Sequence, residues 1–294
     1  MNKVGFIGVG IMGKSMVRNL MKAGFELHIY ARTKSKVEDV ISEGAQFHES
    51  IKDCVQDCDA VITIVGFPQD VEEVYFDEGN ILDSAKEGAY LIDMTTTSSQ
   101  IAEKIYAEGT KRGFHVMDAP VTGGDTGAKA GTLSILVGGE KEDYEACMPL
   151  FEAMGTNINY QGKAGCGQHC KLANQIMIAG TLSGVCEALT YAKEQGLDPE
   201  VFMKSVATGA AGSKQLDTFG PKILKDDYAP GFFMKHFIKD MKLALIESNR
   251  KGLSLDVLSM VLANYEELEQ EGYGDLGTQA LMKFYDEEHR NTEE

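Results

Sequence analysis

Three glycines directly after a short apolar run constrain the fold more than any other feature of this sequence. Residues 4–7 (VGFI) have the composition of a buried strand and lead into Gly8, Gly10 and Gly13, with the spacing G-x-G-x-x-G. The first glycine of such a motif permits a tight turn, the second a close approach to a ligand, and the third close packing of helix on strand. Since a helix-length segment ending near Gly24 follows, the chain is expected to open with a βαβ unit.

Strand-like and helix-like segments continue to alternate to about residue 162. The expected strands are residues 4–7, 27–30, 60–65, 90–93, 115–117, 134–137 and 157–160. Strands that alternate with helices form parallel βαβ units. Residues 1–162 are therefore predicted to be an α/β domain with a Rossmann-type doubly wound sheet.

The strand signal disappears after about residue 165, and helical periodicity replaces it. The expected helices are residues 170–195, 199–207, 237–251 and 255–271. Residues 163–294 are predicted to be an all-α domain for substrate binding and oligomerisation, beginning with a long interdomain helix. The charged tail, residues 286–294, is expected to fray.

Composition argues against several classes of protein. The net charge of −17 repels nucleic-acid phosphates, and no stripe of Lys and Arg offsets it. The sequence has no run of 18 apolar residues, so no membrane partner is expected. Six cysteines lack the spacing of a secreted disulfide framework, which predicts a cytoplasmic protein.

The glycine motif predicts a dinucleotide site. The helix that it opens would present free N–H groups and its positive dipole end to a pyrophosphate, with Ile11 and Met12 in the first turn. NAD-selective folds usually carry an acidic residue after the second strand, whereas this chain has Arg32 and Thr33. Arg32 can stack on adenine and pair with a 2′-phosphate, which predicts NADP with NAD as a possibility. A solvated loop is the alternative for Arg32.

Two further strand ends are expected to contact the cofactor, because ligands bind outside the carboxyl ends of parallel strands. Val65 and Gly66 follow one strand, and Thr96 lies in a run of three threonines after the next. From residue type alone, those threonines more often cap the helix beginning near Ser98.

Two later segments carry side chains suited to substrate chemistry. Thr122, Gly123 and Gly124 follow a strand, and a hydroxyl beside exposed glycine amides can cradle a carboxylate. Lys171 and Asn174 follow a glycine-rich turn and are three residues apart, so they share a helix face toward the interdomain cleft. Taken singly, the first segment is more often a tight turn, and the lysine more often a solvated surface residue.

Together these motifs resemble the β-hydroxyacid dehydrogenase family, which includes 3-hydroxyisobutyrate dehydrogenase, tartronate semialdehyde reductase and glyoxylate/succinic semialdehyde reductases. The resemblance covers nearly the whole chain, and four motifs occur in order. They are the glycine fingerprint, D-A-P-V-[ST]-G-G at 118–124, G-x-x-G-x-G-x-x-x-K-x-x-N at 162–174, and Lys239-Asp240.

This resemblance implies an NAD(P)-dependent oxidoreductase that moves hydride between nicotinamide and a small carboxylate-bearing β-hydroxyacid or semialdehyde. It implies that Lys171 is the general acid/base, that Asn174 binds substrate and that Lys239 lies beside the nicotinamide. Thr122 to Gly124 would hold the substrate carboxylate, and Thr96 would contact the cofactor. No metal is implied, since the cofactor carries the redox chemistry.

The chain departs from the family pattern at three points. Thr122 replaces a frequent Ser, Gln175 replaces a frequent second Asn, and Val65-Gly66 replaces the usual Leu-Pro. These changes bear on the substrate more than on the reaction. Lys235 and His236 precede the Lys239 motif and are candidates for reading a further anionic group, although an ordinary helix start explains them equally well.

Three other functions are compatible with parts of the sequence. A metal site could use Cys166, His169 and Cys170, with Cys54 and Cys58, but the chain lacks a paired C-x-x-C set. A non-catalytic NADP-binding sensor or scaffold would keep the fold without needing Lys171. An imine or sugar-acid reductase would share the fold, although relatives that reduce imines usually lack the lysine.

The helical half is also expected to self-associate as a homodimer or homotetramer, which the family resemblance supports. It holds more apolar residues than one small helical domain is expected to bury. These residues include Met203, Leu253, Leu258, Met260, Val261 and Leu262.

Overall fold

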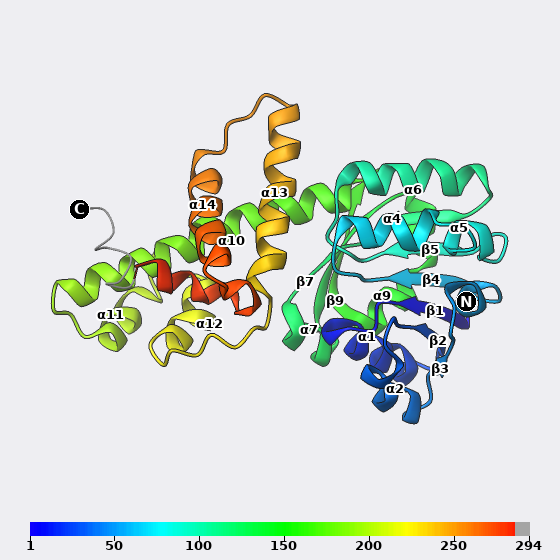
Figure 1. Cartoon of the computed structure of the whole chain (residues 1–294), viewed down its shortest axis with the longest axis horizontal. Helices are drawn as coiled ribbons and strands as arrows, with labels where there is room; N and C mark the ends of the chain where they lie inside the picture. Colours follow the sequence, from blue (N-terminus) through cyan, green and yellow to red (C-terminus); the bar gives the residue numbers. More distant parts are fainter. Residues whose placement is uncertain (286–294) are drawn as a thin grey trace. The chain divides into compact units, whose positions relative to one another are not determined.

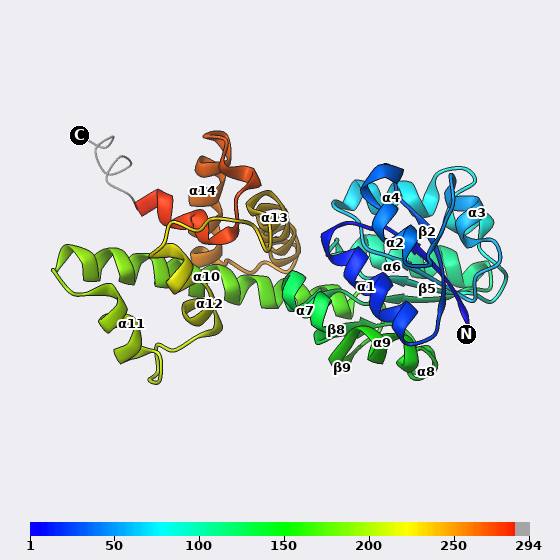
Figure 2. The same ribbon diagram turned by 90° about the horizontal axis from the view of Figure 1, so that it is seen from below.

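The computed structural model divides the chain into two compact units, Met1–Lys171 and Leu172–Glu294, and describes residues 1–285 (Figures 1 and 2). The predicted tail, residues 286–294, lies outside the described residues. The division falls later than the boundary predicted after residue 162, because residues 165–168 bond to strand ends of the first unit.

The first unit contains one nine-stranded sheet. Its strands are β1 (Lys3–Ile7), β2 (Glu26–Tyr30), β3 (Gln46–Phe47), β4 (Ala60–Thr63), β5 (Tyr90–Asp93), β6 (His115–Asp118), β7 (Val121–Thr122), β8 (Leu133–Gly138) and β9 (Gly155–Gly162). They lie in the order β3-β2-β1-β4-β5-β6-β8-β7, and β9 pairs with β8. The first six positions reproduce the Rossmann order, so the fold class predicted from the sequence is confirmed.

Strands β1 to β6 are mutually parallel, whereas β8 runs antiparallel to both β6 and β7. All seven predicted strands are present. Strands β3 and β7 were not predicted, because two residues are too few to show an alternating pattern. The strand expected at 60–65 ends at Thr63, which leaves Val65 and Gly66 in the following loop.

Helices cover both faces of this sheet (Figure 2). They are α1 (Ile11–Lys22), α2 (Glu38–Ser42), α3 (Ile51–Val55), α4 (Pro68–Phe76), α5 (Ile81–Ser84), α6 (Ser99–Lys111), α7 (Gly124–Ala130), α8 (Lys141–Ala146) and α9 (Met148–Met154), with a 3-10 turn η1 (Lys34–Lys36). Side chains alternate along a strand, so Phe6 and Ile7 enter different cores. Helices α1 and α9 build the first core, and α3, α4 and α6 the second.

The second unit is entirely helical in its described part. The helix α10 (Cys166–Glu194) enters it from the first unit and is followed by α11 (Pro199–Val206), α12 (Lys214–Ile223), α13 (Met234–Arg250), α14 (Asp256–Gln270) and the 3-10 segments η2 (Tyr273–Asp275) and η3 (Thr278–Tyr285). The four predicted helices are present. Helix α12 was not predicted, and it contains Pro221, a residue that normally marks a helix end.

Helix α10 is long and apolar enough to cross a membrane by length and composition alone. The core helix of a water-soluble protein passes the same test. Leu182, Cys186 and Leu189 are buried in the core of the second unit, where α13 and α14 pack. We attribute the apolar composition of α10 to that core.

The second unit buries part of the apolar set that the sequence analysis expected it to leave uncovered. Leu258, Val261 and Leu262 are 2%, 0% and 7% exposed, so the expectation is wrong for these three residues. They lie on one side of α14 and pack into the unit's own core. Leu253 and Met260 remain 57% and 51% exposed.

Candidate active site

The glycine loop between β1 and α1 has the shape that a pyrophosphate requires. Gly8 has a φ of +97°, and a Cβ there would lie 2.0 Å from the carbonyl oxygen of Ile64. A Cβ on Gly13 would lie 2.2 Å from the carbonyl oxygen of Gly8. Around Gly10, in contrast, a Cβ would meet nothing within 4 Å, and no side chain caps α1. The loop thus presents open backbone and uncapped N–H groups, which fits a dinucleotide phosphate.

Arg32 and Thr33 follow β2 and are exposed, as a 2′-phosphate site requires. The guanidinium Nη2 of Arg32 lies 3.0 Å from Oδ1 of Asp70, in the first turn of α4. Lys34, which also follows β2, forms its ion pair with Glu49, and the distance from Nζ to Oε1 is 3.2 Å. The sequence analysis missed Asp70, although its place just past the end of β4 is a signal that could have found it.

The threonine run after β5 does not cap the next helix. Ser98 does so, because its hydroxyl accepts the N–H of Ile101 at 3.1 Å. Thr95 instead accepts the N–H of Val65 at 3.0 Å and so ties together the loops after β4 and β5. Thr96 is half-buried between two buried threonines. The capping interpretation is therefore wrong for these threonines, while the predicted cofactor role of Thr96 stays a prediction.

A buried carboxylate closes the end of β5. Asp93 is 2% exposed, and its Oδ1 accepts the Thr63 hydroxyl at 2.7 Å and the N–H of Thr95 at 3.1 Å. Its Oδ2 has no hydrogen-bond partner within residues 1–285. Burial raises the pKa of Asp93 to about 6, which the hydrogen bonds only partly oppose.

The predicted carboxylate cradle begins on the two-residue strand β7. Thr122 ends β7, and Gly123 and Gly124 have φ values of +128° and +63°, which favour glycine. A Cβ on Gly124 would meet nothing within 4 Å, so its backbone is approachable. The geometry is compatible with the predicted substrate role of these three residues, which stays a prediction.

The first turn of α10 is anchored to the ends of β5 and β6. Asp118 accepts the backbone N–H groups of Gly165 and Gln168 at 2.7 and 2.8 Å. The fully buried side chain of Gln168 donates to the carbonyl of Thr95 at 2.8 Å and accepts the N–H of Thr97 at 3.0 Å. These anchors were not predicted, although Asp118 and Gln168 lie inside the motifs at 118–124 and 162–174.

This anchoring needs close backbone contact. A Cβ on Gly167 would lie 2.3 Å from the carbonyl oxygen of Leu136, and one on Gly138 would lie 2.6 Å from Oδ1 of Asp118. Both glycines therefore let the strand end and the helix start meet. Lys171 follows Gln168 by three residues and is only 8% exposed. The alternative of a solvated surface lysine is wrong at this position.

The next residues of α10 belong to a buried network in the second unit. Asn174 donates to Oε1 of Gln175 at 2.8 Å, and Gln175 donates to Oδ2 of Asp240 at 2.6 Å. Lys239 Nζ lies 3.0 Å from the other Asp240 oxygen. Gln175 and Asp240 are 2% and 0% exposed. The network thus joins two predicted site residues, Asn174 and Lys239, through Gln175, a departure from the family pattern, and Asp240, the second residue of the Lys239-Asp240 motif.

Lys235 and His236 were candidates for binding a further anion. Lys235 Nζ donates to Oδ1 of Asp275 at 2.6 Å, so its positive charge is already paired with a carboxylate. His236 lies against the rings of Phe232 and Phe233. These contacts favour the ordinary helix-start interpretation.

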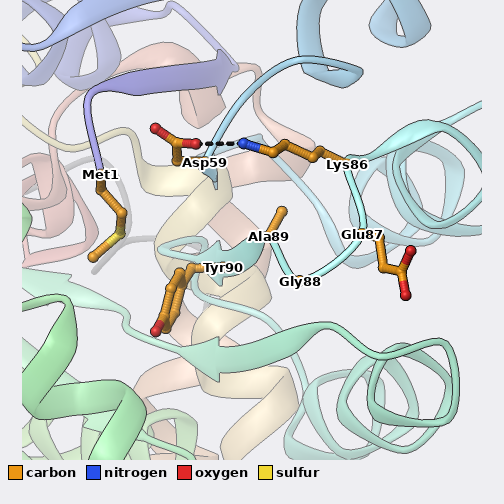
Figure 3. A pocket seen from close by; sticks show the side chains of 7 residues that line it. All are labelled: Met1, Asp59, Lys86, Glu87, Gly88, Ala89 and Tyr90. Atoms are coloured by element: carbon orange, nitrogen blue, oxygen red, sulfur yellow. Dashed lines mark hydrogen bonds and ion pairs between the residues drawn. The ribbon is translucent and has the colours of Figure 1, made fainter.

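A small surface hollow in the first unit lies away from all these residues (Figure 3). It is lined by Met1, Asp59, Lys86, Glu87, Gly88, Ala89 and Tyr90. Asp59 and Tyr90 stand at the starts of β4 and β5, whereas ligands of such sheets bind at the carboxyl ends. Its volume of about 230 Å³ is also smaller than typical ligand sites, so we assign it no role.

No group of three or more His, Cys, Asp or Glu side chains within residues 1–285 is arranged to hold a metal ion. Cys54 and Cys58 are buried, and their thiols donate to backbone carbonyl oxygens at 3.3 and 3.1 Å. Burial raises the pKa of the Cys58 thiol to about 12, and that of Cys54 higher still. The thiolate that a metal needs is therefore disfavoured at both positions.

Comparison with known proteins agrees with this architecture. Residues 3–162 match the family model for the NAD-binding domain of 6-phosphogluconate dehydrogenase. Residues 165–285 match the model described as the NAD-binding region of NADP-dependent 3-hydroxyisobutyrate dehydrogenase. Together the two models cover most of the chain.

Individual relatives each cover most of the chain. The chain is 49% identical over 282 residues to the uncharacterized oxidoreductase YkwC of Bacillus subtilis, covering 96% of this chain and 98% of that protein. It is 36% identical over 253 residues to 2-hydroxy-3-oxopropionate reductase of Escherichia coli, covering 86% of each. The solved structure of Mycobacterium tuberculosis 3-hydroxyisobutyrate dehydrogenase with L-serine superposes with a TM-score of 0.88 at 26% identity, covering 96% of this chain and 98% of that chain.

The fold, the glycine loop and the two family models together identify the chain as an NAD(P)-binding oxidoreductase. The chain belongs to the β-hydroxyacid dehydrogenase family.

Proposed function

We propose that the chain reduces a small carboxylate-bearing semialdehyde, or oxidises the matching β-hydroxyacid, with Lys171 as general acid/base. The observation that supports this most is a lysine that is 8% exposed, one turn after a helix start anchored by Asp118 and Gln168. Desolvation makes the burial of a lysine costly, so a buried lysine at this place is a stronger candidate for a chemical role than an exposed one. Two of the proteins named above, 2-hydroxy-3-oxopropionate reductase and 3-hydroxyisobutyrate dehydrogenase, are named for compounds of this class.

Each proposed role follows from the chemistry of the group. The bound cofactor supplies hydride exchange at the nicotinamide. Lys171 donates a proton to the substrate carbonyl oxygen during reduction and accepts it during oxidation, while Asn174 orients that oxygen. Thr122 and the amides of Gly123 and Gly124 hold the carboxylate, which keeps the reacting carbon in place.

We further propose that NADP is the preferred cofactor and NAD the second. The main support for NADP is Arg32. Its side chain is 69% exposed at the end of β2, and no acidic residue is adjacent to it in the sequence. Thr33 is exposed next to it and offers a hydroxyl. Gly8, Gly10 and Gly13 shape the pyrophosphate loop, with Ile11 and Met12 in the first turn of α1. Val65, Gly66, Thr96 and Lys239 are proposed to contact the rest of the cofactor.

The active form is proposed to be a homodimer or homotetramer. Met177, Val257 and Met260 of the second unit are 73%, 59% and 51% exposed. An interface between copies of the chain would cover such apolar side chains. Light scattering should give a multiple of the monomer mass. A monomer at all working concentrations would reject this proposal.

The decisive test is an activity screen. Small semialdehydes, 3-hydroxyacids and L-serine are each offered with NADPH or NADH, or with the oxidised cofactors, and nicotinamide absorbance is followed. We expect turnover of at least one compound of this class, faster with the NADP pair. Tight NADPH binding without turnover of any compound would favour the sensor alternative instead.

A further inference from the structure

The cation proposed to bind the 2′-phosphate already has a carboxylate partner. Arg32 Nη2 lies 3.0 Å from Asp70 Oδ1, and the two side chains are 69% and 16% exposed. Strand β1 pairs with β2 on one side and β4 on the other, so an ion pair from the end of β2 to α4 spans the end of β1. That end carries the Gly8 turn.

Of the two partners, Asp70 is the fixed one. Its second oxygen, Oδ2, accepts the backbone N–H of Phe67 at 3.0 Å, which caps α4 just before Pro68. A capping carboxylate is held by the helix start. The Arg32 side chain is longer and mostly solvent-exposed, and exposed ion pairs are weak. A ligand anion can therefore draw Arg32 away, while Asp70 stays in place.

We propose that Asp70 is a specificity-determining residue that reduces the preference for NADP over NAD. Its carboxylate competes with the 2′-phosphate for Arg32 and also repels that phosphate through space. NADH brings no 2′-phosphate and leaves the Arg32–Asp70 pair intact, so its affinity is nearly independent of Asp70. This inference rests on the proposed role of Arg32 in binding NADP.

Asp70→Asn is the informative variant, because an amide oxygen can still accept the N–H of Phe67 while the negative charge is lost. The matched control is Glu72→Gln. Glu72 lies on the same helix and pairs with Lys104 at 3.0 Å, away from Arg32. This control removes an equal charge from α4 without touching the proposed site. Melting temperatures confirm that both variants are folded.

Dissociation constants for NADPH and NADH are measured by fluorescence titration, without substrate, at low and at physiological ionic strength. We expect Asp70→Asn to tighten NADPH binding about three- to tenfold at low salt and NADH less than about twofold, with a smaller gain at higher salt. Glu72→Gln should change neither constant by more than about twofold. Equal changes for both cofactors, or weaker NADPH binding, would overturn the inference.

Arg32→Ala separates this inference from the function on which it rests. Selective loss of NADPH affinity in Arg32→Ala, with no selective gain in Asp70→Asn, would reject the role of Asp70 alone. An unchanged ratio of NADPH to NADH affinity in Arg32→Ala would reject the NADP assignment and the role of Asp70 together.

Discussion

Two buried carboxylates bond to helix α10 in different ways. Asp118, which is 3% exposed, accepts two backbone N–H groups, those of Gly165 and Gln168. Asp240, which is fully buried, accepts the side-chain amide of Gln175 and pairs with Lys239. The first carboxylate thus binds main chain in the first unit, and the second binds side chains in the second unit.

The difference separates two tasks. Backbone N–H groups move only with the helix, so Asp118 determines where α10 begins. Side-chain partners keep their own torsional freedom, so Asp240 orients Gln175 and, through it, Asn174. Burial raises the pKa of Asp118, while its two backbone bonds favour the charged form. Asp118 thus holds the start of α10 in position through main-chain bonds, whereas Asp240 orients Gln175 and Asn174 through side-chain bonds.

The largest expected effect tests whether the anchored turn carries a working group. Lys171→Ala should lower the single-turnover rate on the best substrate about 10²- to 10⁴-fold, the range for loss of a general acid/base. NADPH affinity should change little, because the glycine loop is intact. The control is Lys163→Ala, an exposed lysine in the same glycine-rich turn. Retention of more than about a tenth of the rate in Lys171→Ala would refute the mechanism.

A third buried carboxylate, that of Asp93, has one oxygen without a hydrogen-bond partner within residues 1–285. The pKa of Asp93 is raised from 3.8 to about 6, so the folded chain holds this proton more tightly than the unfolded chain. The protonated side chain therefore contributes its full stabilisation below about pH 4, and this stabilisation is lost as the pH rises through about 6. The loss in the free energy of unfolding is about 3 kcal/mol.

Asp93→Asn should remove this pH dependence. We expect the free energy of unfolding of the wild type, minus that of Asp93→Asn, to fall between about pH 4 and pH 7 in denaturant titrations. Asp57→Asn, at an exposed aspartate, is the control. A difference that stays flat over this range would mean that Asp93 does not titrate there.

Asp118→Asn should loosen the main-chain anchor. The Asn side chain has only one oxygen, so its NH2 group would face a backbone N–H that needs an acceptor. The lost bond is one to a charged group, and such a bond contributes about 1.5 to 3 kcal/mol. Denaturation should show a loss of this size in the free energy of unfolding. Gly167→Ala attacks the same contact from the helix side and should also destabilise the protein. If both variants were as stable as the wild type, the anchor would have no energetic role.

The smallest expected effect concerns the side-chain network. Gln175→Asn shortens the side chain by one methylene and should break its bond to the Asp240 carboxylate, at a cost in the free energy of unfolding of about 1.5 kcal/mol, the low end for a bond to a charged group. We expect kcat to fall about fivefold on the best substrate, with NADPH affinity unchanged. A lower melting temperature with normal kcat would show a purely structural role.

The sequence predicted the sheet and the glycine loop because both depend on local patterns. Periodicity identified seven strands, and the spacing of Gly8, Gly10 and Gly13 identified the turn whose geometry the structure shows. The partners of buried polar groups were not predictable in this way. Asp118 lies 47 and 50 residues before the N–H groups that it binds, and Gln175 lies 65 residues before Asp240.

Motifs thus indicated which residues matter, but not what they touch. The place of Asp70 just past β4 marks it as a candidate, but its pairing with Arg32 depends on the strand order, which puts β2 and β4 on either side of β1. The Lys171 motif was recognised from its spacing, whereas the burial of that lysine follows from tertiary packing. Helix α12 was not predicted, and it contains Pro221, a residue type that disfavours a helix interior.

The close contact at Gly167 has a consequence for engineering a more heat-resistant enzyme. Replacing helical glycines by alanine is a common route to stabilisation, because it reduces the freedom of the unfolded chain. Helix α10 offers two opposite cases. A methyl group on Gly184 would meet nothing within 4 Å, whereas one on Gly167 would strike the carbonyl of Leu136. A library that treats the helix as uniform would combine a helpful change with one that separates α10 from the strand ends that hold it.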